Sequence, residues 1–216
     1  MTTNRSPKDA STRYSPLPVQ YAVRRVLLPM SLVFVFTHFC GSPIHAQPAK
    51  SASEFMTEAG HVEFLSNVPL HSFVGQSDRL TGRVSLADST VDFFVDLGTL
   101  RTGNGKRDKD MRKTLNTEDY PFAEFFGKLI SPFDPSISQA QPASVEGVFK
   151  IHGHEKRMRI DGELRMADGT LTVSAKWDVS LDDFDINPPR LLIMKVEDVQ
   201  HVSISATLHP VNEEHQ

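Results

Sequence analysis

The amino-acid sequence predicts an all-β domain of antiparallel strands, arranged either as a sandwich or as an up-and-down barrel. Apolar and polar residues alternate along most of the chain, short turn sequences separate the alternating segments, and only one segment has helical periodicity. Short links favour hairpins over parallel strands with crossover helices. At least seven alternating segments are present, at residues 61–68, 91–97, 123–129, 148–153, 157–164, 171–179 and 202–208.

Each of these segments repeats its apolar residues every second position, as a strand with one buried face does. In residues 91–97, for example, Val91, Phe93 and Val95 share one face, while aspartates lie on the other. The apolar faces would meet in the interior of a barrel. The candidates for this interior are Val62, Phe64, Val91, Phe93, Val95, Phe125, Leu129, Phe149, Ile151, Met158, Ile160, Val173, Trp177 and Ile204.

Two of the links between strands have residues that favour tight turns. Asp168-Gly169 follows the segment at 157–164, and His152-Gly153 ends the segment at 148–153. Both links therefore predict antiparallel hairpins.

Only residues 106–116 are expected to be helical. Asn104 can cap the N-terminus of this helix, and Met111 and Leu115 lie four residues apart on one face. The sequence therefore predicts a short helix that lies across a sheet edge or a barrel mouth. Its charged residues are expected to face water; they are Lys106, Arg107, Asp108, Lys109, Asp110 and Arg112.

Residues 1–46 resemble a secretory signal peptide. Arg24-Arg25 precedes an apolar run at residues 26–40, and Ala46 is a small residue of the kind found just before a cleavage site. An uncleaved transmembrane helix is the alternative. The run contains Pro29, however, and is shorter than the roughly 20 residues that a membrane span needs. We therefore expect cleavage after Ala46.

Cleavage after Ala46 would leave a polar linker at residues 47–53 and a periplasmic or secreted protein without a stable membrane span. It would also remove Cys40, the only cysteine of the chain. Lipidation of Cys40 is an alternative, but the residues before it do not resemble a lipidation site. Without cysteine the mature protein would have no disulfides, and its stability would come from its core.

The charge balance disfavours contact with nucleic acid and with an anionic membrane surface. The formal net charge is −4, and the first 46 residues contain five basic residues and one acidic residue. The remainder is therefore more acidic than the chain as a whole. Phosphate groups would be repelled by such a domain.

The residue types that carry catalysis or bind metals do not form a recognisable pattern. His152 and His154 lie at an expected hairpin tip without a third ligand. The acidic residues between Asp178 and Asp185 do not have the spacing of a calcium loop. Ser77 lies in a stretch that lacks the second glycine of a nucleophile elbow. We therefore expect a protein that is not an enzyme and needs neither metal nor cofactor.

Residues 91–125 contain a more specific pattern. An alternating strand is followed by Thr-Gly-Asn, then by Lys-Arg-Asp, a helix with a leucine, Tyr-Pro and a further strand. This pattern resembles the YceI-like family of secreted lipid-binding proteins, and Gly147 and Gly153 match glycines of the family's next hairpin. The similarity spans residues 54–210 and leaves 211–216 as a C-terminal tail. The matching residues are Thr102, Gly103, Asn104, Lys106, Arg107, Asp108, Leu115, Tyr120, Pro121 and Phe125.

The resemblance implies an eight-stranded antiparallel lipocalin-like barrel with one short helix between strands, large enough to hold one ligand. Family members are associated with long isoprenoid chains and some with quinones, so a bound isoprenoid lipid or quinone is expected. The sequence departs from the family after Trp177. Leu181 stands where the family usually has an arginine, so a headgroup contact from that arginine lacks support here.

Two functions from different classes remain open, because composition does not distinguish a hollow barrel from a filled one. In the first, a hollow barrel holds an isoprenoid-type or other long apolar lipid for transport, storage or sequestration. The helix would then close over the lipid, and an anionic headgroup would meet Lys106, Arg107 and Arg112. In the second, the core is filled and the protein acts through a protein partner or as a homodimer, using Phe94, Phe122 and Phe126 on the outer face.

Overall fold

The computed structural model describes residues 53–68, 71–187 and 196–211. The predicted signal peptide at residues 1–46 and most of the predicted linker lie outside the described residues. None of the helices in the described ranges is long and apolar enough to cross a membrane.

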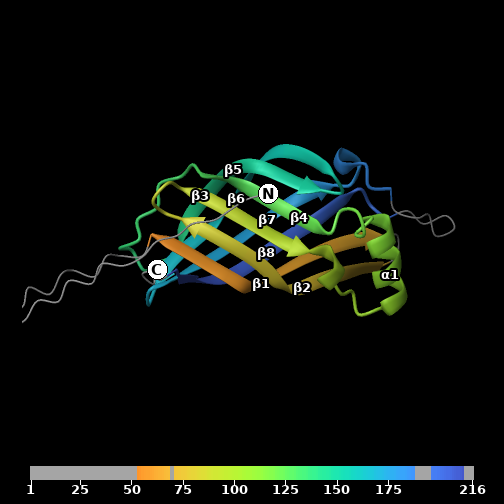
Figure 1. Ribbon diagram of the computed structural model, residues 1–216, viewed down its shortest axis with the longest axis horizontal. Helices are drawn as coiled ribbons and strands as arrows, with labels where there is room; N and C mark the ends of the chain where they lie inside the picture. Colours follow the sequence, from red (N-terminus) through yellow and green to blue (C-terminus); the bar gives the residue numbers. More distant parts are fainter. Residues whose placement is uncertain (1–52, 69–70, 188–195, 212–216) are drawn as a thin grey trace, which may run out of the picture. The chain divides into compact units, whose positions relative to one another are not determined.

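Eight antiparallel strands close into one barrel (Figure 1), so the predicted fold class is confirmed. Each strand pairs with its neighbour in sequence, and β1 pairs with β8 to complete the ring. The strands are β1 (Glu54–Val68), β2 (His71–Ser85), β3 (Thr90–Asp96), β4 (Phe122–Leu129), β5 (Gln141–Ile151), β6 (His154–Ala167), β7 (Thr170–Ser180) and β8 (Val199–Pro210).

Both predicted tight turns are present as two-residue links. His152 and Gly153 join β5 to β6 with φ angles of 55° and 78°. Asp168 and Gly169 join β6 to β7 with φ angles of 51° and 75°. Positive φ at both positions matches the twist of the flanking strands, which is why glycine follows an Asp or His in such turns.

The alternating pattern did not reveal β2, and it placed the start of β1 too late. The pairing of the two strands shifts register twice, between Thr57 and Gly60 and between Gly60 and Val62. At the second shift Asp78 and Arg79, consecutive residues of β2, are both exposed. An irregularity of this kind interrupts the period-two pattern that identifies strands.

Helix α1 (Gly105–Thr114) connects β3 and β4 and lies at one end of the barrel (Figure 1). The side chain of Asn104 accepts hydrogen bonds from the backbone N–H groups of Lys106 and Arg107, which confirms the predicted cap. Two 3₁₀ helices, η1 (Leu97–Thr99) and η2 (Asp182–Phe184), follow β3 and β7. Strand directions place both at the same end of the barrel as α1.

The expectation that all charged residues of α1 face water is wrong for Asp108. Asp108 is only 6% exposed, and its carboxylate accepts hydrogen bonds from the backbone N–H of Thr102 at 2.8 Å and from the Thr102 hydroxyl at 2.5 Å. The carboxylate therefore ties the first turn of α1 to the loop that precedes it. The Thr102 hydrogen bonds lower the pKa of Asp108 below its usual value, and the charges of Arg101 and Arg112 act in the same direction.

We expect Asp108→Asn to destabilise the protein by about 2 kcal/mol at pH 7, because a hydrogen-bonded charged acceptor is lost. The pKa of Asp108 is lower in the folded than in the unfolded protein. Its contribution is therefore fully present above about pH 4 and disappears as the pH falls through the folded-state value. Urea unfolding of wild type and Asp108→Asn at pH 7 and at pH 3 measures this contribution. The difference between their free energies of unfolding should be smaller at pH 3 than at pH 7. Asp110→Asn, on the same helix, is the matched control. Equal stability of wild type and Asp108→Asn at pH 7 would contradict the assignment.

Candidate functional site

The interior of the barrel contains a cavity of about 480 Å³. Its wall is almost entirely apolar, and most of the residues predicted for the interior line it. These are Val62, Phe64, Val91, Phe93, Val95, Phe125, Phe149, Ile151, Ile160, Val173, Trp177 and Ile204.

Two predicted interior residues do not line the cavity. Leu129 is the last residue of β4, at the end of the barrel remote from α1, and Met158 faces Gly147 across the β5–β6 pair. Both are partly buried and pack against the core. They support the wall but do not reach the lumen.

Sequence reasoning missed several residues of the cavity wall. Leu80 and Val84 belong to β2, the strand that the alternating pattern did not reveal. Leu181 and Ile186 follow β7, and Ile186 is 2% exposed. Because Leu181 lines the cavity, the position at which the family usually has an arginine is apolar here.

The barrel interior leaves room for a cavity because bulky inward-facing residues pair with glycines on the neighbouring strand. Phe64 pairs with Gly75, and Phe93 pairs with Gly82. A Cβ atom at Gly75 would lie 2.3 Å from the Phe64 ring, and one at Gly82 would lie 2.0 Å from the Phe93 ring. Each ring therefore lies against the wall, over its glycine, and leaves the lumen free. The barrel is hollow, and the alternative of a filled core is not supported.

The α1 end of the cavity is partly closed by aromatic residues. Phe149 contacts Trp177 edge-to-face at a centroid distance of 6.3 Å and Phe184, in η2, at 5.5 Å. Phe184 is 1% exposed, and its backbone carbonyl lies 3.1 Å from Nδ1 of His152. The opposite end is filled by Phe55, Leu171 and Leu208, which are buried but do not line the cavity.

Helix α1 contributes a more polar part of the wall at the same end, through Lys106, Arg107 and Asp110. The guanidinium group of Arg107 donates hydrogen bonds to the Thr102 hydroxyl and carbonyl and lies 4.3 Å from the centre of the Phe73 ring. Arg107 therefore holds α1 against β2. Arg112 does not line the cavity. The three predicted headgroup cations thus do not form one group around the lumen.

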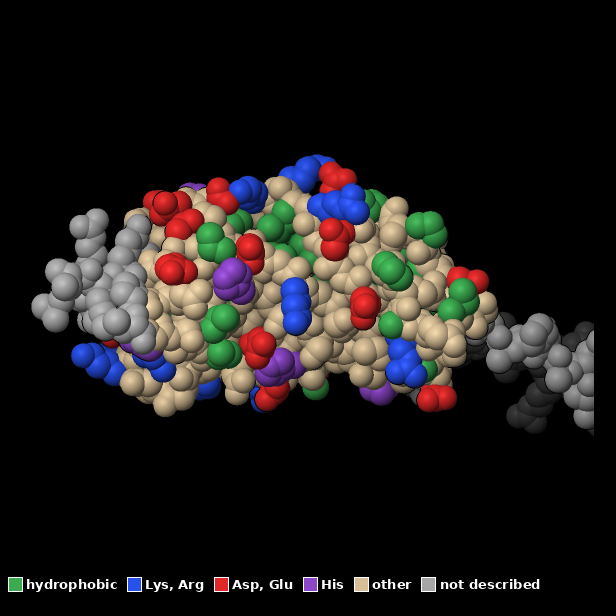
Figure 2. Space-filling model, turned by 180° about the vertical axis from the view of Figure 1, so that it is seen from behind, with side chains coloured by type: hydrophobic (Ala, Val, Ile, Leu, Met, Phe, Trp, Pro, Cys, Tyr) green, Lys and Arg blue, Asp and Glu red, His purple; other side chains and the backbone are tan. Residues whose placement is uncertain are grey.

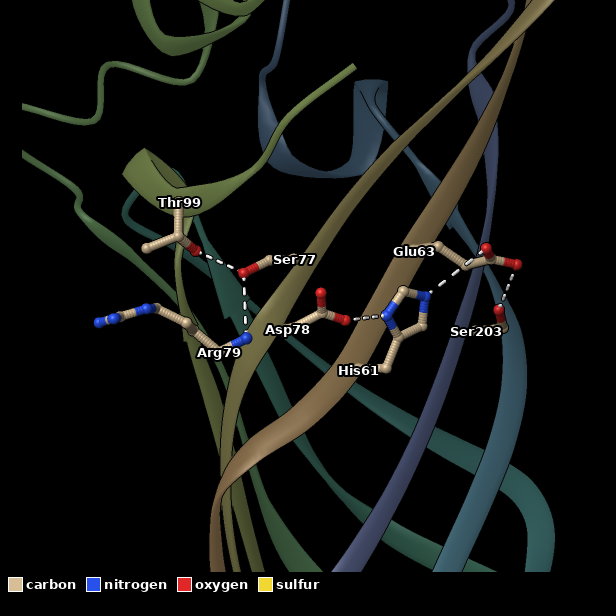
Figure 3. Close-up of polar contacts among 7 residues, drawn as sticks. All are labelled: His61, Glu63, Ser77, Asp78, Arg79, Thr99 and Ser203. Carbon is tan, nitrogen blue, oxygen red and sulfur yellow. Dashed lines mark hydrogen bonds and ion pairs between the residues drawn. The ribbon is translucent and has the colours of Figure 1, made fainter. Parts of the chain in front are cut away.

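Figure 3 shows that Ser77 and the nearest His–Asp pair point to different neighbours. The hydroxyl of Ser77 lies 2.7 Å from that of Thr99, whereas Nδ1 of His61 lies 2.6 Å from the Asp78 carboxylate. Asp78 is exposed, while Ser77 is buried at 5% exposure. The arrangement is not that of a nucleophile activated by a histidine, whose imidazole must be within reach of the hydroxyl.

The outer surface of the barrel carries mixed charges. On the face shown in Figure 2, acidic, basic, histidine and scattered hydrophobic side chains are interspersed. Several acidic residues have partners: Asp178 pairs with His201 at 2.6 Å, and Asp183 pairs with Lys156.

Within the described ranges no group of three or more potential ligands is placed to hold a metal ion. His152 and His154 stack on each other at the β5–β6 turn.

A closed antiparallel barrel around an apolar cavity defines the class of lipocalin-like ligand-binding barrels. The chain belongs to the YceI-like domain family, whose model matches residues 45–208. This is a family of binding domains.

Solved structures of at least two other proteins share this fold. A polyisoprenoid-binding domain from Saccharophagus degradans, implicated in plant cell wall breakdown, is 15% identical with a TM-score of 0.63, over 74% of this chain and 99% of that chain. BcnA from Burkholderia cenocepacia is 12% identical with a TM-score of 0.57, over 69% of this chain and 95% of that chain. None of the curated proteins compared with the chain matches it. At these identities the structures establish the fold alone.

Proposed function

We propose that this protein is a non-catalytic carrier that holds one long apolar lipid of the isoprenoid type in the barrel. The apolar cavity of about 480 Å³ carries the proposal. Its volume is typical of small-molecule pockets, which span about 300–1,000 Å³. The similar barrel from Saccharophagus degradans is described as polyisoprenoid-binding, which supports a lipid of that class.

Burial of the chain itself would supply most of the affinity. Each CH₂ group removed from water contributes about 0.8 kcal/mol, and rings held against the wall, such as Phe93 over Gly82, keep the lumen free for it. Neither a metal nor a cofactor is needed for binding of this kind. A prenylated quinone would fit the proposal as well as a plain isoprenoid.

Native mass spectrometry of the purified protein, followed by organic extraction, tests the proposal. We expect an adduct with the mass of an isoprenoid-type lipid that disappears after extraction, and rebinding of farnesol by the extracted protein. A protein that carries no lipid and binds neither farnesol nor longer prenyl alcohols would contradict the proposal.

A second candidate function rests on the outer face of β3 and β4. Phe94 and Phe122 contact each other edge-to-face at 5.7 Å and are each about two-fifths exposed, and Phe126 is 59% exposed. Exposed aromatic groups of this kind are typical of interaction surfaces. We propose a homodimer through this face as an addition to lipid binding. Sedimentation of wild type and Phe126→Asp over a range of concentrations tests it, and a monomeric wild type would contradict it.

We also propose that the protein is exported and that its first 46 residues are removed. The basic pair Arg24-Arg25, the following apolar run and Ala46 support this proposal. N-terminal sequencing of the exported protein should begin at Gln47-Pro48-Ala49. A chain that still begins near Met1 in the membrane fraction would show that the segment is a retained anchor.

A further inference from the structure

Two polar atoms in the cavity wall have no hydrogen-bond partner among the described residues. They are Oγ of Ser66 and Nε1 of Trp177. Both residues line the cavity, and Ser66 is 1% exposed. Buried donors are almost always paired in native proteins, and leaving one unpaired costs about 1–3 kcal/mol. Two such donors in one otherwise apolar cavity therefore require an explanation.

Both donors lie in the half of the barrel nearest α1. Ser66 is two residues from the end of β1, and Trp177 is three residues from the end of β7. Strand β8 lies between them, where Val202 pairs with Trp177 on one side and with Phe64 on the other. The contact between Trp177 and Phe149 fixes the position of the indole ring. The unpaired donors thus lie at the end of the lumen where α1 adds polar side chains such as Lys106 and Asp110, and the wall is otherwise mostly apolar.

The charges at this end do not favour an anionic headgroup. The guanidinium group of Arg107 already donates hydrogen bonds to Thr102 and lies over the ring of Phe73. Lys106 lines the cavity together with Asp110, which carries the opposite charge. A diphosphate brought to this position would meet a carboxylate as well as a lysine, and it would lose its hydration without a set of free cations to replace it.

Given the proposed lipid-binding function, we propose that the preferred ligand is an uncharged lipid with a hydrogen-bond-accepting oxygen group at one end of its apolar chain. The oxygen atoms of this group accept hydrogen bonds from Nε1 of Trp177 and Oγ of Ser66 at the α1 end. The hydrocarbon chain extends from there between Phe93 and the other apolar residues of the wall. A few placed donors in an apolar pocket fix the orientation and the specificity of a ligand in this way.

Three probes with the same prenyl chain test the inference: farnesyl acetate, which has neutral acceptor oxygens; farnesene, a hydrocarbon; and farnesyl diphosphate, an anion. Their dissociation constants are measured with the extracted full-length protein. We expect farnesyl acetate to bind at least about tenfold more tightly than farnesene, the effect of two modest hydrogen bonds, and also more tightly than farnesyl diphosphate. In the double variant Ser66→Ala, Trp177→Phe this advantage should disappear, while farnesene still binds.

The outcomes separate the inference from the function on which it rests. If farnesene and farnesyl acetate bind wild type equally, or the double variant keeps the preference, the polar site is wrong although lipid binding stands. A preference of wild type for farnesyl diphosphate also overturns it. If none of the three probes binds, both the polar site and the proposed function are wrong. Because the wild-type comparison needs no variant, the inference stays testable if the double variant fails to fold.

Discussion

Phe125→Asp is expected to abolish lipid binding and to destabilise the protein by about 4 kcal/mol or more. Phe125 is 7% exposed, lines the cavity and lies between Phe93 and Phe149 in the cross-strand register. Removing a buried phenylalanine side chain costs about 3–5 kcal/mol, and the new carboxylate would be buried without a partner. Its charge would also stand in the path of the apolar ligand.

The adjacent residue provides a matched control. Phe126 lies on the opposite face of β4 and is 59% exposed. Measured at a protein concentration at which any dimer has dissociated, Phe126→Asp should therefore change the free energy of unfolding of the monomer by no more than about 0.5 kcal/mol. Urea unfolding and lipid retention in native mass spectrometry are measured for both variants. If Phe125→Asp does not fold, Phe125→Ala provides the cavity measurement with a smaller perturbation. Equal lipid retention in the Phe125 and Phe126 variants would show that Phe125 does not contact the ligand.

Gly147→Val should destabilise the barrel by about 3 kcal/mol or more, because two strand backbones approach each other closely at this residue. Gly147 pairs with Gly127, and a Cβ atom at Gly147 would lie 2.3 Å from the carbonyl oxygen of Phe126 and 2.6 Å from Cα of Gly127. Both are backbone atoms, so the clash can be relieved only by moving β4 away from β5. Overpacking that requires backbone shifts costs about 1–3 kcal/mol or more.

Gly105→Ala tests whether this effect is specific to the close approach. Gly105 is the first residue of α1, and a Cβ atom there would have no neighbour within 4 Å. Alanine in a helix is favoured over glycine by up to about 1 kcal/mol, so this variant should be slightly more stable than wild type. Thermal unfolding of the two variants should show melting temperatures that move in opposite directions. A melting temperature of Gly147→Val close to that of wild type would contradict the close packing of β4 and β5.

The strand pattern was predictable where the alternation is regular. Residues 91–97, for example, predict β3 directly, because Val91, Phe93 and Val95 face the core at every second position without a break in the alternation. Strand β2 was not predictable in this way. Its inward positions include Gly75 and Ser77, and the exposed pair Asp78 and Arg79 interrupts the alternation. Only the resemblance to the family supplied this eighth strand.

The apolar wall was predictable from the same alternation, but the hollow interior was not. Whether Phe64 fills the lumen or lies against the wall depends on Gly75, its partner in the register of β1 and β2. Cross-strand register is a tertiary property that composition does not contain. A usable signal was nevertheless present, because Gly127, Gly147 and Gly162 all occupy inward positions of strands whose inward faces are otherwise mostly apolar. Glycine at such positions indicates a close backbone approach or open space.

The charged residues of α1 show a different limit of prediction from the sequence. In sequence Asp108 is one of six similar charged residues, and helical periodicity alone assigned it to the solvent. In the structure it is buried by hydrogen bonds from Thr102, six residues earlier. The loop conformation between the two residues, with Gly103 at a φ of 74°, brings them together. The helical period predicts which side chains share a face of α1, but it does not predict the conformation of the loop before the helix.

The order of strands around the barrel has a consequence for how the chain folds. All strand pairs but one join neighbours in sequence, so their hairpins can form from local contacts. The pair of β1 and β8, in contrast, brings Phe55 to Pro210, and long-range closure of this kind is entropically costly and slow. We therefore expect the ring to close last. Because the lumen exists only after closure, a lipid would bind the closed chain alone and shift the folding equilibrium towards it. A carrier of this design would become fully stable only when it is loaded.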